Sequence, residues 1–176
     1  GLSTAEGSPT CNLPLSEGKG WMYEGGTREP LIIRYPKVIK GGSVCDVPIT
    51  STDFYPTILE MAGLDLMPDQ HCDGVSFFGL FNGKTKLDRD AIFWHYPHYG
   101  NQGGTPGASV RCGGYKLIEF FEDGRLELYN LVDDVSEKNN VAEEKRNLTK
   151  ELKEMLNDWK VKVGAKIPER NPDYKD

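Results

Sequence analysis

The sequence predicts a chain of two parts, the end of an α/β domain followed by a small α+β unit. In the first part, one apolar run at 31–34 precedes one helix. That is too little for a parallel sheet, because such a sheet needs neighbouring strands and cover on both faces. The second part holds several strand-like runs and closes with an amphipathic helix. We therefore expect a domain boundary between residues 1–89 and 90–176.

The first part is expected to run from a loop into a buried strand. Residues 1–20 are rich in Gly, Ser, Pro and Thr and show no sustained period. Leu31 to Arg34 is short, apolar and branched, and Pro36 follows it. Such a run is typical of a buried strand.

A helix is predicted in the stretch 50–64, TSTDFYPTILEMAGL. Thr52 or Asp53 supplies a cap for the first free amides, and Pro56 is tolerated in a first turn. Gly63 ends the helix. Farther along, VSFFGLF is expected to form one short helical turn.

The second part is expected to be an antiparallel sheet with a helix packed on it. Strand-like runs occupy 91–97, 109–121 and 125–131, with a tight turn at 122–124 between the last two. Apolar residues from Leu148 to Val163 recur every three or four positions, and Gly164 follows as a stop.

Composition narrows the class of protein. The 176 residues carry a formal net charge of −6 with a pI near 5.2, which argues against nucleic acid as a main partner. No apolar run approaches the roughly 18 residues of a membrane span, and no leader of the signal-peptide type is visible. A local cluster of basic side chains is still able to hold an anion, because the contact acts over a few ångströms.

The run GKGWMYEGGTREPLIIRYP contains three charged candidates. Lys19 lies between two glycines, where backbone approaches a ligand closely and an ammonium suits sulfate or phosphate. A solvated loop lysine is the alternative. Glu24 and Arg28, four residues apart, are expected to pair and to hold the loop before the strand.

Two histidines, His95 and His98, lie in FWHYPHYGNQGG before a glycine-rich run. Aromatic rings and imidazoles beside a flexible loop suit a sugar, which is bound by stacking and hydrogen bonds. The alternative is an ordinary strand end with surface histidines. No nucleophile elbow, phosphate loop, zinc signature or paired-carboxylate motif is present.

These motifs, in this order, resemble the carboxy-terminal part of type I sulfatases of the arylsulfatase A-like branch: GKGWMYEGGTREP, VPITSTDFYPTILEMAG, DGVSFFGLFNG, IFWHYPHYGNQGG and YKLIEFFEDGRLELYNL. The resemblance implies an alkaline-phosphatase-like α/β fold with a smaller subdomain of four antiparallel strands and a helix. It also implies hydrolysis of sulfate esters, with a formylglycine nucleophile and a bound Ca²⁺. Degradation of sulfated polysaccharides, in the periplasm or outside the cell, is the expected setting.

The resemblance gives Lys19 a contact with the sulfate. A substrate subsite formed by His95 and His98 is our own hypothesis. The family's Cys-or-Ser-x-Pro-x-Arg nucleophile motif is missing around Cys11 and Cys45, and its acidic calcium ligands are missing too. We therefore expect a fragment that binds no metal, is inactive alone and needs the N-terminal catalytic part of the same protein.

The expected substrate is a sulfated saccharide or aryl sulfate. Two alternatives stay open at this point. One is a binding or structural module derived from the sulfatase fold, and the other is a related phosphoesterase.

Overall fold

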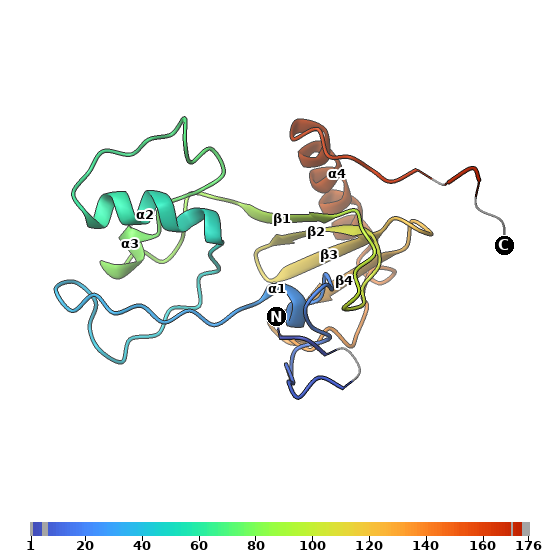
Figure 1. Ribbon diagram of the computed structural model, residues 1–176, viewed down its shortest axis with the longest axis horizontal. Helices are drawn as coiled ribbons and strands as arrows, with labels where there is room; N and C mark the ends of the chain where they lie inside the picture. The colour runs from blue at the N-terminus through green and yellow to red at the C-terminus, as the bar shows by residue number, and fades with distance from the viewer. Residues whose placement is uncertain (1, 5–6, 170, 174–176) are drawn as a thin grey trace. The chain divides into compact units, whose positions relative to one another are not determined.

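The computed structural model describes residues 2–4, 7–169 and 171–173 (Figure 1). The helices are α1 (Glu24–Thr27), the 3-10 helix η1 (Ser51–Asp53), α2 (Phe54–Met61), α3 (Phe78–Phe81) and α4 (Arg146–Lys162). The strands are β1 (Ala91–Tyr96), β2 (Gly107–Cys112), β3 (Tyr115–Phe120) and β4 (Leu126–Asn130).

The chain divides into two compact units. One joins Gly1–Pro30 with Ala91–Asp176, and the other is Leu31–Asp90. The glycine-rich lysine segment therefore belongs to the same unit as the small sheet. The predicted domain boundary between residues 89 and 90 refers to the fold that the resemblance implies, and it stays a prediction.

The first unit is built on a four-stranded antiparallel sheet in the order β1-β2-β3-β4. The predicted sheet and packed helix are confirmed, with one correction. The run 109–121 is two strands, because Gly113 and Gly114 form a hairpin turn that pairs Cys112 with Tyr115. Gly113 has φ +56°, a conformation that glycine adopts without steric cost. The turn expected at 122–124 joins β3 to β4.

Helix α4 covers one face of this sheet, as Figure 1 shows. The buried contacts between sheet and helix come from Ala108, Val110, Leu117, Leu128, Leu152 and Leu156. Phe93 of β1 stacks on Trp159 of α4 with ring centroids 4.9 Å apart. The predicted amphipathic helix is confirmed, and Gly164, at φ +62°, follows its end.

The N-terminal segment around α1 covers the opposite face (Figure 1). Met22 is buried there with Ile118, Phe120, Tyr129 and Leu131. Because side chains alternate along a strand, this face also receives Arg111, Lys116 and Glu127. The sheet is thus closed on one side mainly by apolar contacts, and on the other by a mixture of apolar and charged side chains.

The second unit contains the predicted helix α2, and polar contacts cap the N-terminus of this helix. Thr50 and Asp53 form a capping box at η1, immediately before α2. Asp53 is fully buried, and both of its carboxylate oxygens accept hydrogen bonds of 2.9 Å from the Arg89 guanidinium. The helical turn expected in VSFFGLF is α3.

The predicted buried strand at 31–34 is wrong. Residues 31–34 have no regular secondary structure, and the Ile32 side chain is 94% exposed. A strand needs a partner for its backbone groups, and the second unit offers none among its described residues. The apolar run therefore lies on the surface of this unit.

Candidate functional site

Lys19 is exposed and lies in the lysine turn, residues 16–21, whose backbone is hydrogen-bonded. Its N–H donates to the carbonyl of Leu2 at 3.0 Å, and the N–H of Trp21 donates to the carbonyl of Gly18 at 3.0 Å. Gly20 has φ +94°. Within the described residues the Lys19 ammonium has no ion-pair partner. The turn thus fixes the backbone of Lys19 and leaves its charge available to an anion.

Two glycines of α1 allow this turn to fold back tightly. The N–H of Gly25 donates to the carbonyl of Ser16 at 2.8 Å. A Cβ atom on Gly25 would lie 2.2 Å from that oxygen, and one on Gly26 would lie 2.1 Å from the carbonyl oxygen of Trp21. Any larger residue would therefore push the lysine turn away from α1.

Glu24 attaches α1 to the sheet. It is 1% exposed, and Oε1 lies 3.0 Å from Nζ of Lys116. Oε2 lies 3.6 Å from Arg111 and 3.7 Å from Arg28. The spacing of Glu24 and Arg28 thus gives the predicted contact, but Arg28 is half exposed and the stronger partner is Lys116. The role of the pair in holding the loop stays a prediction.

Lys116 and Glu137 complete this contact, and the sequence did not predict a role for either residue. Lys116 is fully buried, and its Nζ lies 3.2 Å from Oε1 of Glu137. Oε2 of Glu137 accepts the backbone N–H of Glu24 at 2.6 Å. Burial raises the pKa of Glu137 above its ordinary value, although Lys116 and the Glu24 N–H oppose the rise. A lysine on the same strand face as Ile118 and Phe120 was the one signal available.

A second carboxylate on this face binds two tyrosines. Glu127 accepts hydrogen bonds from Tyr23 at 2.7 Å and from Tyr129 at 2.8 Å. Burial raises the pKa of both phenols, and their bonds to Glu127 raise it further. Both tyrosines therefore stay neutral donors at physiological pH, and Tyr23 fastens the segment just before α1.

The glycine-rich loop after β1 packs directly on the lysine turn. A Cβ atom on Gly104 would lie 2.2 Å from the carbonyl oxygen of Gly20, and one on Gly103 would lie 2.6 Å from Nε1 of Trp21. Gln102 accepts a hydrogen bond of 2.5 Å from the Ser3 hydroxyl. The structure therefore brings together two segments that are about 80 positions apart in the sequence.

The two predicted histidines have different surroundings. Trp94 of β1 packs against the cluster that contains Met22, and side chains alternate along a strand, so the next residue, His95, lies on the α4 face. Its Nε2 donates to the carbonyl of Lys166 at 2.9 Å. His98 is exposed, lies edge-on to Tyr96 and precedes the glycine-rich loop. The geometry favours a structural role for His95 and leaves His98 available to a ligand.

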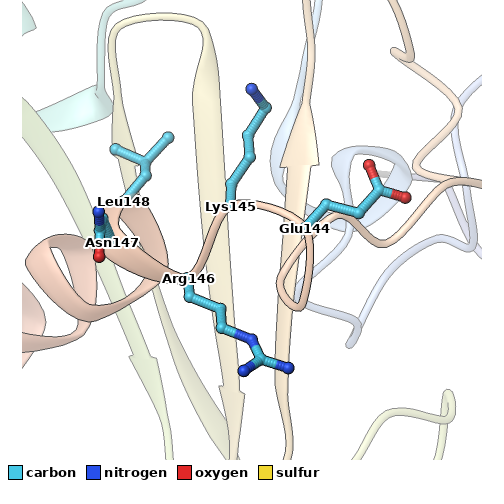
Figure 2. A pocket seen from close by; sticks show the side chains of 5 residues that line it. All are labelled: Glu144, Lys145, Arg146, Asn147 and Leu148. Atoms are coloured by element: carbon cyan, nitrogen blue, oxygen red, sulfur yellow. The ribbon is translucent and has the colours of Figure 1, made fainter.

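A surface hollow at the start of α4 is lined by Glu144–Leu148. Figure 2 shows the side chains of Glu144, Lys145 and Arg146 pointing in different directions. Arg146 is already paired with Glu143 at 2.9 Å. None of the predicted site residues lines this hollow, and its side chains do not converge on a ligand.

The described residues contain no group of three or more His, Cys, Asp or Glu side chains that could hold a metal ion. They therefore do not fit the calcium that the resemblance implies.

No helix in the described part of the chain has both the length and the apolar character needed to cross a membrane.

The comparison with known families decides the classification. Residues 17–162 match the family described as N-sulphoglucosamine sulphohydrolase, C-terminal. The chain belongs to this family. The matched range begins just before the lysine turn and ends with α4, so it includes both segments of the candidate site.

Two relatives of this chain are named as sulfatases. A sulfatase of Formosa agariphila is 35% identical over 172 residues, which cover 89% of this chain and 31% of that protein. The N-acetylglucosamine-6-O-sulfatase of Bacteroides thetaiotaomicron is 36% identical over 143 residues, covering 78% and 25%. The chain thus spans a third or less of the length of these relatives. The predicted resemblance to the C-terminal part of sulfatases is confirmed.

Solved structures agree with this classification. A protein in complex with its substrate D-glucosamine-2-N,6-O-disulfate is 32% identical, with a TM-score of 0.62 over 73% of this chain and 27% of that one. Ps i-CgsB, solved with k-i-k-neocarrahexaose, is 27% identical, with a TM-score of 0.71 over 85% and 32%.

Proposed function

We propose that the chain is the C-terminal part of an enzyme that hydrolyses sulfate esters of saccharides, and that Lys19 contacts the sulfate group. One observation carries the proposal. Lys19 is an exposed ammonium on a turn that is braced from two sides, by α1 and by the glycine-rich loop. A cation carried on a fixed backbone needs little reorganisation to stabilise a developing anion.

The proposed substrate class follows from the relatives. One is named for a 6-O-sulfated amino sugar, and a solved neighbour holds a disulfated glucosamine. The glycine-rich loop offers backbone amides and the neighbouring Tyr96 and His98, which suit a hydroxyl-rich ligand. We therefore place a saccharide subsite at this loop and assign it to His98 in preference to His95.

The nucleophile, a formylglycine, and the Ca²⁺ belong to the catalytic part of the proposed enzyme, which this chain does not contain. The chain supplies a positive charge and part of the substrate cleft, and by itself it is expected to be inactive. A periplasmic or secreted location is part of the same proposal.

Turnover by the intact protein that carries this chain tests the proposal. Incubation with glucosamine 6-O-sulfate or N-sulfate should release inorganic sulfate, measured by ion chromatography, and the isolated chain should release none. If the folded intact protein releases no sulfate from any sulfated amino sugar or aryl sulfate, the proposal is wrong. Faster turnover of glucosamine 6-phosphate would favour a phosphoesterase instead.

A further inference from the structure

Lys116 joins three separate parts of the first unit. It projects from β3 and is fully buried, and its Nζ lies 3.0 Å from Glu24 of α1 and 3.2 Å from Glu137. The same atom donates to the Thr27 hydroxyl of α1 at 3.2 Å. Glu137 lies in the connection between β4 and α4 and has φ +49°, a conformation that is uncommon for glutamate.

Helix α1 connects this junction, the contacts of Lys116 with Glu24, Thr27 and Glu137, to the lysine turn. At its first residue, the N–H of Glu24 donates to Glu137 at 2.6 Å. At its second residue, the N–H of Gly25 donates to the carbonyl of Ser16, three residues before Lys19. Cβ atoms on Gly25 and Gly26 would lie only 2.1 to 2.2 Å from carbonyl oxygens of the lysine turn. Because α1 packs so closely on these oxygens, α1 cannot move without moving the turn.

Stability alone does not explain why this junction is ionic. Replacing a buried ion pair with apolar side chains is often neutral or stabilising, because the charges lose their hydration. The α4 face of the same sheet is closed mainly by apolar side chains. Charged hydrogen bonds are more directional than apolar contacts, because the ammonium holds two carboxylates and one hydroxyl at set positions around a single nitrogen atom.

We propose that Lys116 and Glu137 are positioning residues for Lys19, which fix α1 and through it the lysine turn. This inference rests on the proposed function, in which Lys19 contacts the sulfate. Without the Lys116 ammonium, the buried carboxylates of Glu24 and Glu137 lose the cation that lies 3.0 and 3.2 Å from them. Arg111, 3.6 Å from Glu24, replaces only part of this charge. The carboxylates then move apart and α1 shifts with Glu24.

A double-mutant cycle in the intact protein tests the inference. Lys116→Met keeps most of the side-chain volume and should lower kcat/KM for a sulfate ester about tenfold to a hundredfold, as expected for a displacement near 1 Å. In the Lys19→Ala background the same substitution should change kcat/KM by less than about twofold, because the group it positions is gone. A role in stability alone would give equal losses in both backgrounds.

Glu119→Gln is the matched control. Glu119 is on the same strand, faces α4 and is bound by two lysines, Lys153 and Lys160. It should lower the unfolding midpoint and leave kcat/KM unchanged. If Lys116→Met does not fold, Glu137→Gln provides a milder test, with a loss of about threefold that disappears in the Lys19→Ala background.

The outcomes separate the two claims. If Lys19→Ala has normal kcat/KM, the proposed function of Lys19 is wrong and the positioning role falls with it. If Lys19→Ala is impaired but the effect of Lys116→Met or Glu137→Gln is additive with it, only the positioning role is wrong. Coupling between the two sites supports both.

Discussion

The substitution Gly25→Ala tests how closely α1 and the lysine turn depend on each other. The new Cβ would lie 2.2 Å from the carbonyl oxygens of Ser16 and Glu17, where ordinary contact begins near 3.4 Å. The overlap is about 1.2 Å, and it is with backbone atoms that cannot rotate away. The turn must therefore move by about 1 Å, or the helix must.

Two effects follow from this displacement. Overpacking of this kind costs about 1–3 kcal/mol of unfolding free energy. A shift of about 1 Å in Lys19 should lower kcat/KM for a sulfate ester by about a hundredfold. The assays are urea-induced unfolding followed by tryptophan fluorescence, and steady-state release of sulfate by the intact protein.

Gly41→Ala is the control for this experiment. A Cβ atom on Gly41 has no neighbour within 4 Å, so both stability and kcat/KM should stay unchanged. A folded Gly25→Ala variant with the kcat/KM of the natural protein would refute the reasoning. It would mean that α1 and the turn move independently.

Three further predictions concern an ion pair of the second unit, a carboxylate that faces α4, and the proposed saccharide subsite. Arg89→Met leaves buried Asp53 without its guanidinium and should lower the unfolding free energy by about 3–5 kcal/mol, while Arg146→Met, at an exposed pair, should leave the urea midpoint unchanged. Burial raises the pKa of Glu119, but the hydrogen bonds from Lys153 and Lys160 outweigh this effect and lower the pKa overall. The ionised Glu119 therefore stabilises the folded protein above the unfolded pKa near 4.5, and this stabilisation is lost as the pH falls through the folded pKa. Glu119→Gln should therefore lose about 1–2 kcal/mol at pH 7, and the difference in urea unfolding should shrink in acid; a constant difference would contradict this. His98→Ala should impair turnover of a sulfated saccharide more than that of a small aryl sulfate, and equal losses on both would remove His98 from the subsite.

Local patterns in the sequence were sufficient for the elements that depend on near neighbours. The period of three and four from Leu148 to Val163 specified α4, and the polar residues before Phe54 specified the start of α2. The double glycine at 113–114 was the exception, because a strand-like pattern on both sides of it concealed the hairpin. A glycine pair within a strand pattern is a turn signal in its own right.

Long-range contacts were the part that the sequence could not supply. Leu31 to Arg34 has the composition of a buried strand, but a strand forms only where a neighbour accepts its hydrogen bonds. Glu24 has an obvious partner four residues away in Arg28, yet its closest cation is Lys116, 92 positions along the chain. In the same way, nothing local in the glycine-rich loop at 100–107 indicates that it packs on Gly20 and Trp21.

The central claim is that this chain supplies the sulfate-binding lysine of a sulfatase, and one comparison tests it most directly. In the intact protein, Lys19→Ala should lower kcat/KM for a sulfated amino sugar by about a hundredfold or more, as removal of a preorganised charge does. Lys150→Ala, at an exposed lysine of α4 near Glu154, should leave it unchanged. Equal kcat/KM for the natural protein and a folded Lys19→Ala variant would contradict the claim.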